Sequence, residues 1–231
     1  MNHPTEPLSA QEAYSGKRAL DVLAAGAACA VFAPAAALMS LAIRCQDGGP
    51  PLYLQTRVGR RRRPFTILKF RSMRDQRVTR VGRWLRRTGI DELPQLVNVC
   101  RGDMSIVGPR PLTGEDLQRL GWTGAGTDWR FATRPGITGL SQLFGGQGAR
   151  TSLRLDRLYL ERQSLSLDLQ LIGLSFAANL LGKRTVCRLL QAARARSRGA
   201  RGSTSRSDDM PRSPGSAASP ARRASRGGPA A

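Results

Sequence analysis

The sequence predicts a mainly helical α+β protein with an N-terminal membrane helix, a small globular domain and a basic, largely disordered tail. Three observations predict this fold class: an uncharged apolar run near the N-terminus, a mixed middle stretch, and a last stretch of Arg, Ser, Ala, Gly and Pro. That last stretch cannot bury enough apolar area to offset the entropy of ordering it. We expect an N-terminal tail at 1–16, the membrane helix at 17–44, the domain at 45–182 and the basic tail at 183–231.

The membrane helix is predicted from the run Val22–Ile43, which has no charged residue and Ser40 as its only polar side chain. About twenty apolar residues are enough to cross the hydrocarbon core of a bilayer. Pro34 lies near the middle and removes one backbone hydrogen bond, so the helix must bend there. Basic residues flank both ends, and both flanks therefore meet the positive-inside rule. The residues alone leave open a hairpin with two cytoplasmic ends and a single span, with a buried soluble helix as a third reading.

Short apolar runs and turn residues divide the domain into elements. Strand-like runs at 53–54 and 65–68 flank an arginine-rich turn. We expect helices at Thr79–Leu85, Glu92–Cys100, Leu153–Tyr159 and Leu165–Leu181, and loops at 108–111 and 134–136.

The helix at Leu165–Leu181 has a broad apolar face, with Asp168 and Gln170 off it. The apolar face consists of Leu165, Leu169, Ile172, Phe176 and Leu180. A face of this kind either lies in a membrane interface or packs on the core of the domain, and the sequence leaves both open.

The chain is strongly basic, with 37 Lys and Arg against 16 Asp and Glu and a net charge of +21. Such a chain is attracted to nucleic acid, anionic lipid or nucleotide phosphates. Aromatic residues make up 5% of the chain, which argues against a base-stacking surface. The four cysteines form no CxxC pair and the one histidine is His3, which argues against a zinc finger or a Cys/His nucleophile.

The adjacent acidic residues Asp91 and Glu92 stand where a helix should begin, with Pro94 in its first turn. Free backbone N–H groups and the positive end of the helix dipole favour carboxylates there. One interpretation is structural: Asp91 caps the helix and Glu92 complements the dipole. The other is an oxygen site for Mg²⁺ together with a nucleophile or base.

Two cationic segments favour the functional interpretation. Lys69 and Arg71 end an apolar run, and Arg110 lies between Pro109 and Pro111. The arginine fork suits bidentate contact with phosphate, and neighbouring prolines lower the entropy of holding it in place.

Five separate blocks of the chain resemble, in the same order, those of a known family. They are KRALDV at 17–22, QTRVGRRRRPFTILKFRSM at 55–73, TRVGRWLRRTGIDELPQLVNVCRGDMSIVGPRP at 79–111, RPGITGLSQ at 134–142 and LRLDRLYLERQSLSLDLQL at 153–171. Over about residues 17–182 the chain resembles the bacterial sugar transferases of the monotopic phosphoglycosyl transferase family. Its most specific part is DELPQL followed by GDMS and GPRP.

The resemblance implies a re-entrant membrane helix hairpin broken at Pro34, with both ends cytoplasmic, and a small cytosolic catalytic domain with interfacial amphipathic helices. It implies transfer of a sugar 1-phosphate from a nucleotide diphosphate sugar, expected to be a UDP-sugar, to undecaprenyl phosphate, which primes polysaccharide or glycoconjugate synthesis. The expected place is the cytoplasmic face of a bacterial inner membrane, in contact with membrane lipid. No nucleic acid partner is expected, and a homodimer stays open.

The resemblance also assigns roles to residues. Asp91 matches the nucleophile that forms a phosphoaspartyl intermediate, Glu92 matches its acidic partner, and Mg²⁺ is held by this pair. Substrate-binding residues are expected at Arg110, Lys69, Arg71, Pro109 and Gln95.

The chain departs from the pattern of the family in places, for example at Arg62, where a glycine is usual. The alternative function is a membrane-anchored protein that binds nucleic acid or anionic lipid without catalysis. That alternative explains the charge but leaves the block from Asp91 to Pro111 without a purpose.

Overall fold

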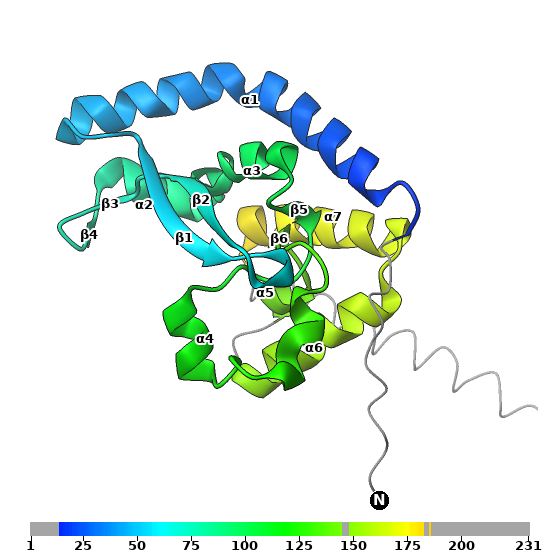
Figure 1. Cartoon of the computed structure of the whole chain (residues 1–231). Helices are drawn as coiled ribbons and strands as arrows, with labels where there is room; N and C mark the ends of the chain where they lie inside the picture. The colour runs from blue at the N-terminus through cyan, green and yellow to red at the C-terminus, as the bar shows by residue number, and fades with distance from the viewer. Residues whose placement is uncertain (1–13, 145–147, 183–184, 186–231) are drawn as a thin grey trace, which may run out of the picture. The chain divides into compact units, whose positions relative to one another are not determined.

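The computed structural model describes residues 14–144, 148–182 and 185 (Figure 1). The helices are α1 (Lys17–Asp47), α2 (Arg80–Thr88), α3 (Gln95–Arg101), α4 (Gly114–Leu120), α5 (Leu140–Phe144), α6 (Ala149–Arg162) and α7 (Leu165–Leu181). The strands are β1 (Leu52–Val58), β2 (Pro64–Phe70), β3 (Met73–Arg74), β4 (Arg77–Val78), β5 (Ser105–Val107) and β6 (Gly136–Thr138). A mainly helical chain with a small sheet-containing domain is thus confirmed. The tails predicted at 1–16 and 183–231 lie almost entirely outside the described residues.

Helix α1 runs without interruption from Lys17 to Asp47, with Pro34 in its interior. Figure 1 shows it arching over α3, so that its two halves run in different directions. In the part of the chain that the structure describes, α1 is the one helix long and apolar enough to cross a membrane. Its middle exposes large apolar side chains such as Leu23 and Val31. The bend agrees with the effect expected of a proline, and the re-entrant hairpin stays a prediction.

The predicted strands form an antiparallel hairpin, in which β1 pairs with β2 from Leu52↔Phe70 to Val58↔Pro64. The two strands are joined by a 3₁₀ turn, Arg60–Arg62, in which Arg61 and Arg62 both have positive φ. The buried side chain of Asn98 on α3 binds the edge of β2: its Oδ1 accepts from the Leu68 amide at 3.0 Å and its Nδ2 donates to the Thr66 carbonyl at 2.8 Å. This double contact fixes α3 beside the hairpin.

The helix predicted at Glu92–Cys100 begins later than expected. Residues Ile90–Glu92 form a 3₁₀ turn, Pro94 occupies the N-cap position, and α3 starts at Gln95. Proline has no amide hydrogen to donate back to residue 90, so the turn before it closes through the Leu93 amide to the Ile90 carbonyl instead. Helix α2 is longer than predicted and ends at Thr88, where Gly89 adopts a left-handed conformation.

Strands β5 and β6 pair in parallel, Ser105 with Gly136 and Val107 with Thr138. The backbones meet so closely that a Cβ on Gly136 would lie 2.0 Å from the Gly108 amide nitrogen. Glycine is therefore required where the loop after β5 crosses β6, and the predicted loops at 108–111 and 134–136 are held together by this crossing.

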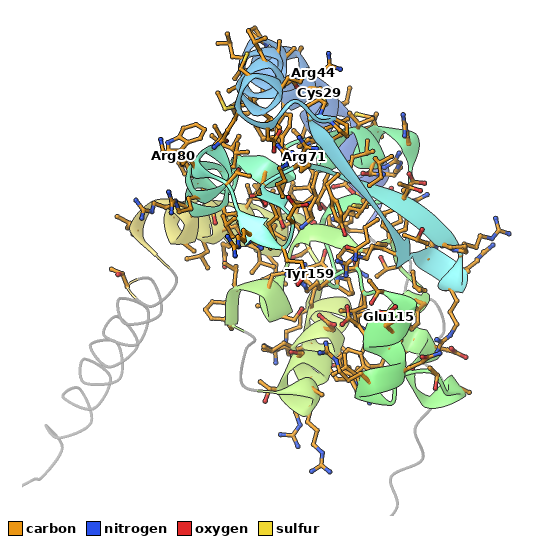
Figure 2. The ribbon with its side chains drawn as sticks, turned by 90° about the vertical axis from the view of Figure 1, so that its left-hand side faces the viewer. Cys29, Arg44, Arg71, Arg80, Glu115 and Tyr159 are labelled. Carbon is orange, nitrogen blue, oxygen red and sulfur yellow. The ribbon has the colours of Figure 1, made fainter. Side chains whose placement is uncertain are left out.

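The main core lies between β5, α5, α6 and α7, where Val107, Leu143, Tyr159 and Leu171 are buried. Figure 2 shows Tyr159 in the interior of the domain. Its hydroxyl lies 2.9 Å from Asp168 Oδ1, and the other carboxylate oxygen of Asp168 accepts a hydrogen bond from Lys17 Nζ. Burial, followed by the nearby Asp168 carboxylate, raises the pKa of Tyr159. The start of α1 is thus tied to α7 by a buried ion pair.

Helix α7 has the predicted bounds, and its orientation tests whether its apolar face packs on the domain core. Asp168 points into the core, whereas Leu165, Leu169, Ile172 and Phe176 are exposed. Leu180 lies in a helix position whose side chain is outside the described set. The predicted apolar face therefore does not pack on the domain core, which is covered instead by residues such as Leu171 and Ala178.

Candidate active site

Half of the predicted site residues line one small pocket of ≈ 20 Å³, and Asp91 is not part of its lining. It is lined by Arg57 of β1, Ile67 and Lys69 of β2, Glu92, Gln95 of α3, Arg110, Pro111, Gly136, Ile137 and Gln142 of α5. Four of the predicted residues, Lys69, Glu92, Gln95 and Arg110, thus come together from segments far apart in the sequence. The pocket has room for about one water molecule, so a larger ligand must move side chains to enter.

The acidic pair lies on the 3₁₀ turn that follows the left-handed Gly89. Glu92 Oε1 accepts a hydrogen bond from Lys69 Nζ at 2.8 Å. Asp91 is half-buried beside this pair. Burial, and next the negative charge of Glu92, raise the pKa of Asp91, while Lys69 and Arg86 oppose the shift. The carboxyl of Asp91 is therefore poorly solvated and feels the charges of Glu92, Lys69 and Arg86, and its role as the nucleophile stays a prediction.

Gln95 is a buried polar residue of the pocket lining, with 2% of its surface exposed. Its Nε2 is buried and has no hydrogen-bond partner among the described residues. A buried amide without a partner costs free energy, so such groups are rare unless a ligand completes them. Gln95 therefore offers a donor to an acceptor atom that enters the pocket.

Arg110 is held through its backbone. The guanidinium of Arg130 donates to the Arg110 carbonyl at 2.7 Å and forms a buried ion pair with Asp156, also at 2.7 Å. On the other side of Arg110, the Pro109 carbonyl accepts from the Gly136 amide at 2.9 Å. These contacts fix the loop, while the side chain of Arg110 remains exposed at the pocket.

Arg57 is a pocket residue that sequence reasoning missed. Its Nη1 lies 3.5 Å from Asp116, and its buried Nε has no hydrogen-bond partner within the described part of the chain. Burial, together with the positive charge of Arg110, lowers the pKa of Arg57. Nothing in a chain with so many arginines singles out Arg57, and only its place in the block QTRVG gave a signal.

Two predicted substrate-binding residues have other surroundings. Arg71 forms an ion pair with Asp47 at the end of α1, and Figure 2 shows it on the side of the domain that faces this helix. Pro109 is buried and acts through its carbonyl group. Neither residue is part of the pocket lining. Pro34, the predicted break in the membrane helix, lies within α1 and is also not part of the lining.

The pocket combines three cations and an unpartnered amide donor with the carboxylate of Glu92, whose neighbour in the chain is Asp91. Lys69, Arg57 and Arg110 supply the positive charge that a phosphate ester attracts. Within the described residues no group of three or more His, Cys, Asp or Glu side chains could hold a metal ion. A metal at this site would therefore depend on the acidic pair, water and the phosphate oxygens of a substrate.

Comparisons with known proteins agree with this chemistry. The family described as "Bacterial sugar transferase" matches residues 12–182. The chain is 42% identical over 194 residues to the UDP-glucose:undecaprenyl-phosphate glucose-1-phosphate transferase of Caulobacter vibrioides, a match that covers 73% of this chain and 71% of the relative.

Two further relatives are similar over almost the same share of the chain. The undecaprenyl-phosphate glucose phosphotransferase of Komagataeibacter xylinus is 38% identical over 72% of this chain and 36% of its own length. The UDP-N-acetylgalactosamine-undecaprenyl-phosphate N-acetylgalactosaminephosphotransferase of Aeromonas hydrophila is 36% identical over 72% of this chain and 44% of its own length. The chain thus matches less than half the length of these two relatives.

Proposed function

This chain belongs to the bacterial sugar transferase family, and we propose that it transfers a sugar 1-phosphate from a UDP-sugar to undecaprenyl phosphate. The product would prime the synthesis of a polysaccharide or glycoconjugate. The observation that carries the proposal is the pocket in which Lys69, Gln95 and Arg110 meet Glu92 of the acidic pair. The three relatives carry glucose or N-acetylgalactosamine in their names, so the sugar is a question for experiment.

In the proposed mechanism a carboxylate oxygen of Asp91 attacks the phosphorus that bears the sugar. The bond to the nucleotide breaks, uridine monophosphate leaves, and a phosphoaspartyl ester remains on Asp91. An oxygen of undecaprenyl phosphate then attacks the same phosphorus, and the Asp91 carboxylate is restored. Two displacements allow a soluble donor and a lipid acceptor to use one site in turn.

The other pocket residues bind and orient the phosphate groups. Arg110 and Lys69, which line the pocket, would neutralise the oxygens around the attacked phosphorus and so lower the barrier for attack by a carboxylate. Gln95 Nε2, which has no partner among the described residues, would donate to an oxygen of the donor. A ligand phosphate that draws Lys69 away from Glu92 would free the Glu92 carboxylate for a metal ion or for a proton.

The residues present fit a magnesium ion. Burial and the neighbouring Glu92 carboxylate destabilise the charged form of Asp91, so added positive charge is favoured beside this pair. Mg²⁺ takes one or two carboxylates, several waters and substrate phosphates, which matches a donor set of Asp91 and Glu92. When bound, the ion would neutralise phosphate oxygens and polarise the phosphorus.

We extend the proposal to the membrane topology. Near its start, Asp21 of α1 accepts a hydrogen bond from Ser105 of the domain at 2.7 Å, and near its end Ile43 packs with Phe70 and Leu85. Because both ends pack on the same domain, they can lie on opposite sides of a bilayer only if the domain crosses it. This supports a re-entrant α1, with its exposed middle in the lipid and the domain on the cytoplasmic face of a bacterial inner membrane.

The test is incubation of the protein with undecaprenyl phosphate, Mg²⁺ and a panel of UDP-sugars. We expect release of uridine monophosphate and a mass-spectrometric adduct on Asp91 when the acceptor is omitted. Asp91→Asn should abolish both, whereas Glu115→Gln on α4, an exposed acidic residue labelled in Figure 2, should change neither. Release of uridine diphosphate, or full turnover by the Asp91→Asn variant, would contradict the proposed reaction.

A further inference from the structure

A second and larger pocket, of ≈ 400 Å³, lies between the turn of the β1–β2 hairpin and the end of α3. Its lining includes five arginines, Arg60, Arg61, Arg63, Arg101 and Arg134, which we call the arginine pocket. The acidic residue in the lining is Asp103. It shares no lining residue with the active-site pocket.

The positive charge of the arginine pocket is not neutralised within the described part of the chain. None of its five arginines forms an ion pair with a described carboxylate, whereas the buried Arg130 pairs with Asp156. Arg60 and Arg134 donate instead to the backbone carbonyls of Ala132 and Gly102. Burial, together with Arg18 and Arg60, lowers the pKa of Arg134. A pocket of this kind favours an anionic ligand.

The hairpin turn that carries three of these arginines is held in place by another arginine, Arg62, which does not line the pocket. Arg62 is turned onto the 3₁₀ segment Ala125–Phe131, where it pairs with Asp128 at 2.7 Å and its guanidinium lies 4.4 Å from the centre of the Phe131 ring. Arg61 has a φ of 55°, which side chains rarely adopt without support from their surroundings. The contacts of Arg62 supply that support, so the turn that carries the neighbouring arginines has a fixed conformation.

The arginine pocket also lies at the start of α1. Arg18, in the first turn of α1, donates to the Cys100 carbonyl at 3.2 Å. One of its guanidinium nitrogens lies 3.4 Å from where a Cβ on Gly102 would be, and Gly102 is part of the pocket lining. Just beyond Arg18, Leu20 and Leu23 expose apolar side chains. The positive charge is therefore concentrated where an apolar, exposed helix meets the domain.

We propose that the arginine pocket binds the phosphate headgroup of an acidic phospholipid. Basic pockets beside membrane helices on the cytoplasmic side bind such headgroups, and the arginine fork matches the oxygens of a phosphodiester. The pocket lies beside the first turn of α1, and this position favours a lipid over a free anion. A lipid whose chains lie along α1 can present its phosphate there. This site goes beyond the transfer reaction and does not depend on its chemistry.

The experiment is native mass spectrometry of the full chain in neutral detergent, titrated with dioctanoyl phosphatidylglycerol. The pocket variant is Arg61→Gln/Arg101→Gln, and the matched control is Arg150→Gln/Arg154→Gln, two exposed arginines of α6. Figure 1 shows α6 on the opposite side of the domain from α1. Both variants lose two charges and keep the basic tail. We expect about 25-fold weaker binding for the pocket variant, from about fivefold per lost charge, and little change for the control.

Further variants and competing ligands identify the ligand and check that the protein is folded. Arg61→Lys/Arg101→Lys keeps the charge and should recover most of the binding, which shows that the Gln variant has not simply unfolded. Dioctanoyl phosphatidylcholine should bind poorly to every variant. The proposal is overturned if both Gln variants lose binding equally, which means diffuse attraction. It is also overturned if glycerol phosphate or uridine monophosphate competes as well as the lipid does, which means a site for free phosphate or for the donor nucleotide.

Discussion

Arg130 donates a hydrogen bond to the main-chain carbonyl of Arg110 at 2.7 Å, so one buried arginine fixes the backbone of another that lines the active-site pocket. Arg130 is held in turn by the Asp156 carboxylate, and the two side chains are only 4% and 2% exposed. The position of Arg110 thus depends on a buried ion pair between the segment Ala125–Phe131 and α6.

This arrangement predicts that stability and activity can be separated. Asp156→Leu leaves Arg130 buried without a counter-charge and should lower the free energy of unfolding by about 3–5 kcal/mol. The double variant Arg130→Met/Asp156→Leu should recover most of that stability, because no uncompensated charge remains. It should not recover kcat/KM, since the hydrogen bond to Arg110 is gone. Thermal unfolding in detergent and steady-state kinetics measure the two quantities. Equal recovery of both would show that the contact with Arg110 has no functional role.

Substitution of Gln95 should impair activity without lowering stability, whereas substitution of an ordinary core residue lowers stability. Its buried Nε2 has no partner among the described residues, so Gln95→Met removes an unsatisfied donor and should leave stability unchanged or raise it by about 1–3 kcal/mol. The donor to substrate is lost at the same time. A hydrogen bond to a charged group contributes about 1.5–3 kcal/mol, which corresponds to a fall in kcat/KM of about 10- to 150-fold. If the variant were strongly destabilised instead, Gln95 would be a structural residue.

The exposed face of α7 should govern membrane affinity without supporting the fold. Leu169 and Phe176 are 60% and 68% exposed, so Leu169→Gln/Phe176→Gln should barely change the melting temperature. If this face lies in the membrane interface, the same variant should bind vesicles more weakly. Leu171→Ala is the matched control on the buried face and should destabilise the domain by about 2–5 kcal/mol. Unchanged vesicle binding by the double Gln variant would exclude a role of α7 in the interface.

Removal of divalent cations should stop transfer reversibly. Chelation with EDTA should abolish release of uridine monophosphate, and Mg²⁺ should restore it. Ca²⁺ should restore it poorly, because the larger ion does not keep the octahedral geometry that Mg²⁺ imposes. The melting temperature should hardly move, since two carboxylates form a small part of the coordination shell. Full turnover in EDTA would remove the metal from the mechanism.

Hydrophobic periodicity and turn residues predict those helices and strands that are determined by short stretches of the sequence. The apolar run of α1, the β1–β2 hairpin around its arginine turn and the bounds of α7 follow from hydrophobic periodicity and turn residues. The start of α3 was predicted too early, because the missing amide of Pro94 shifts the hydrogen bonds of the preceding turn. Pattern marks a helix more reliably than it marks the first residue of that helix.

By itself, the sequence determined the family, through motifs in a fixed order, and the residue types that phosphate chemistry needs. Only the tertiary structure decided which cations share the pocket with Glu92. Lys69, Arg110 and the unforeseen Arg57 line it, while Arg71 pairs with Asp47. It also decided that the apolar face of α7 points outward, because its Asp168 is bound by Lys17 in the core. Periodicity reveals that a helix has two faces, but only the elements packed around it determine which face is buried.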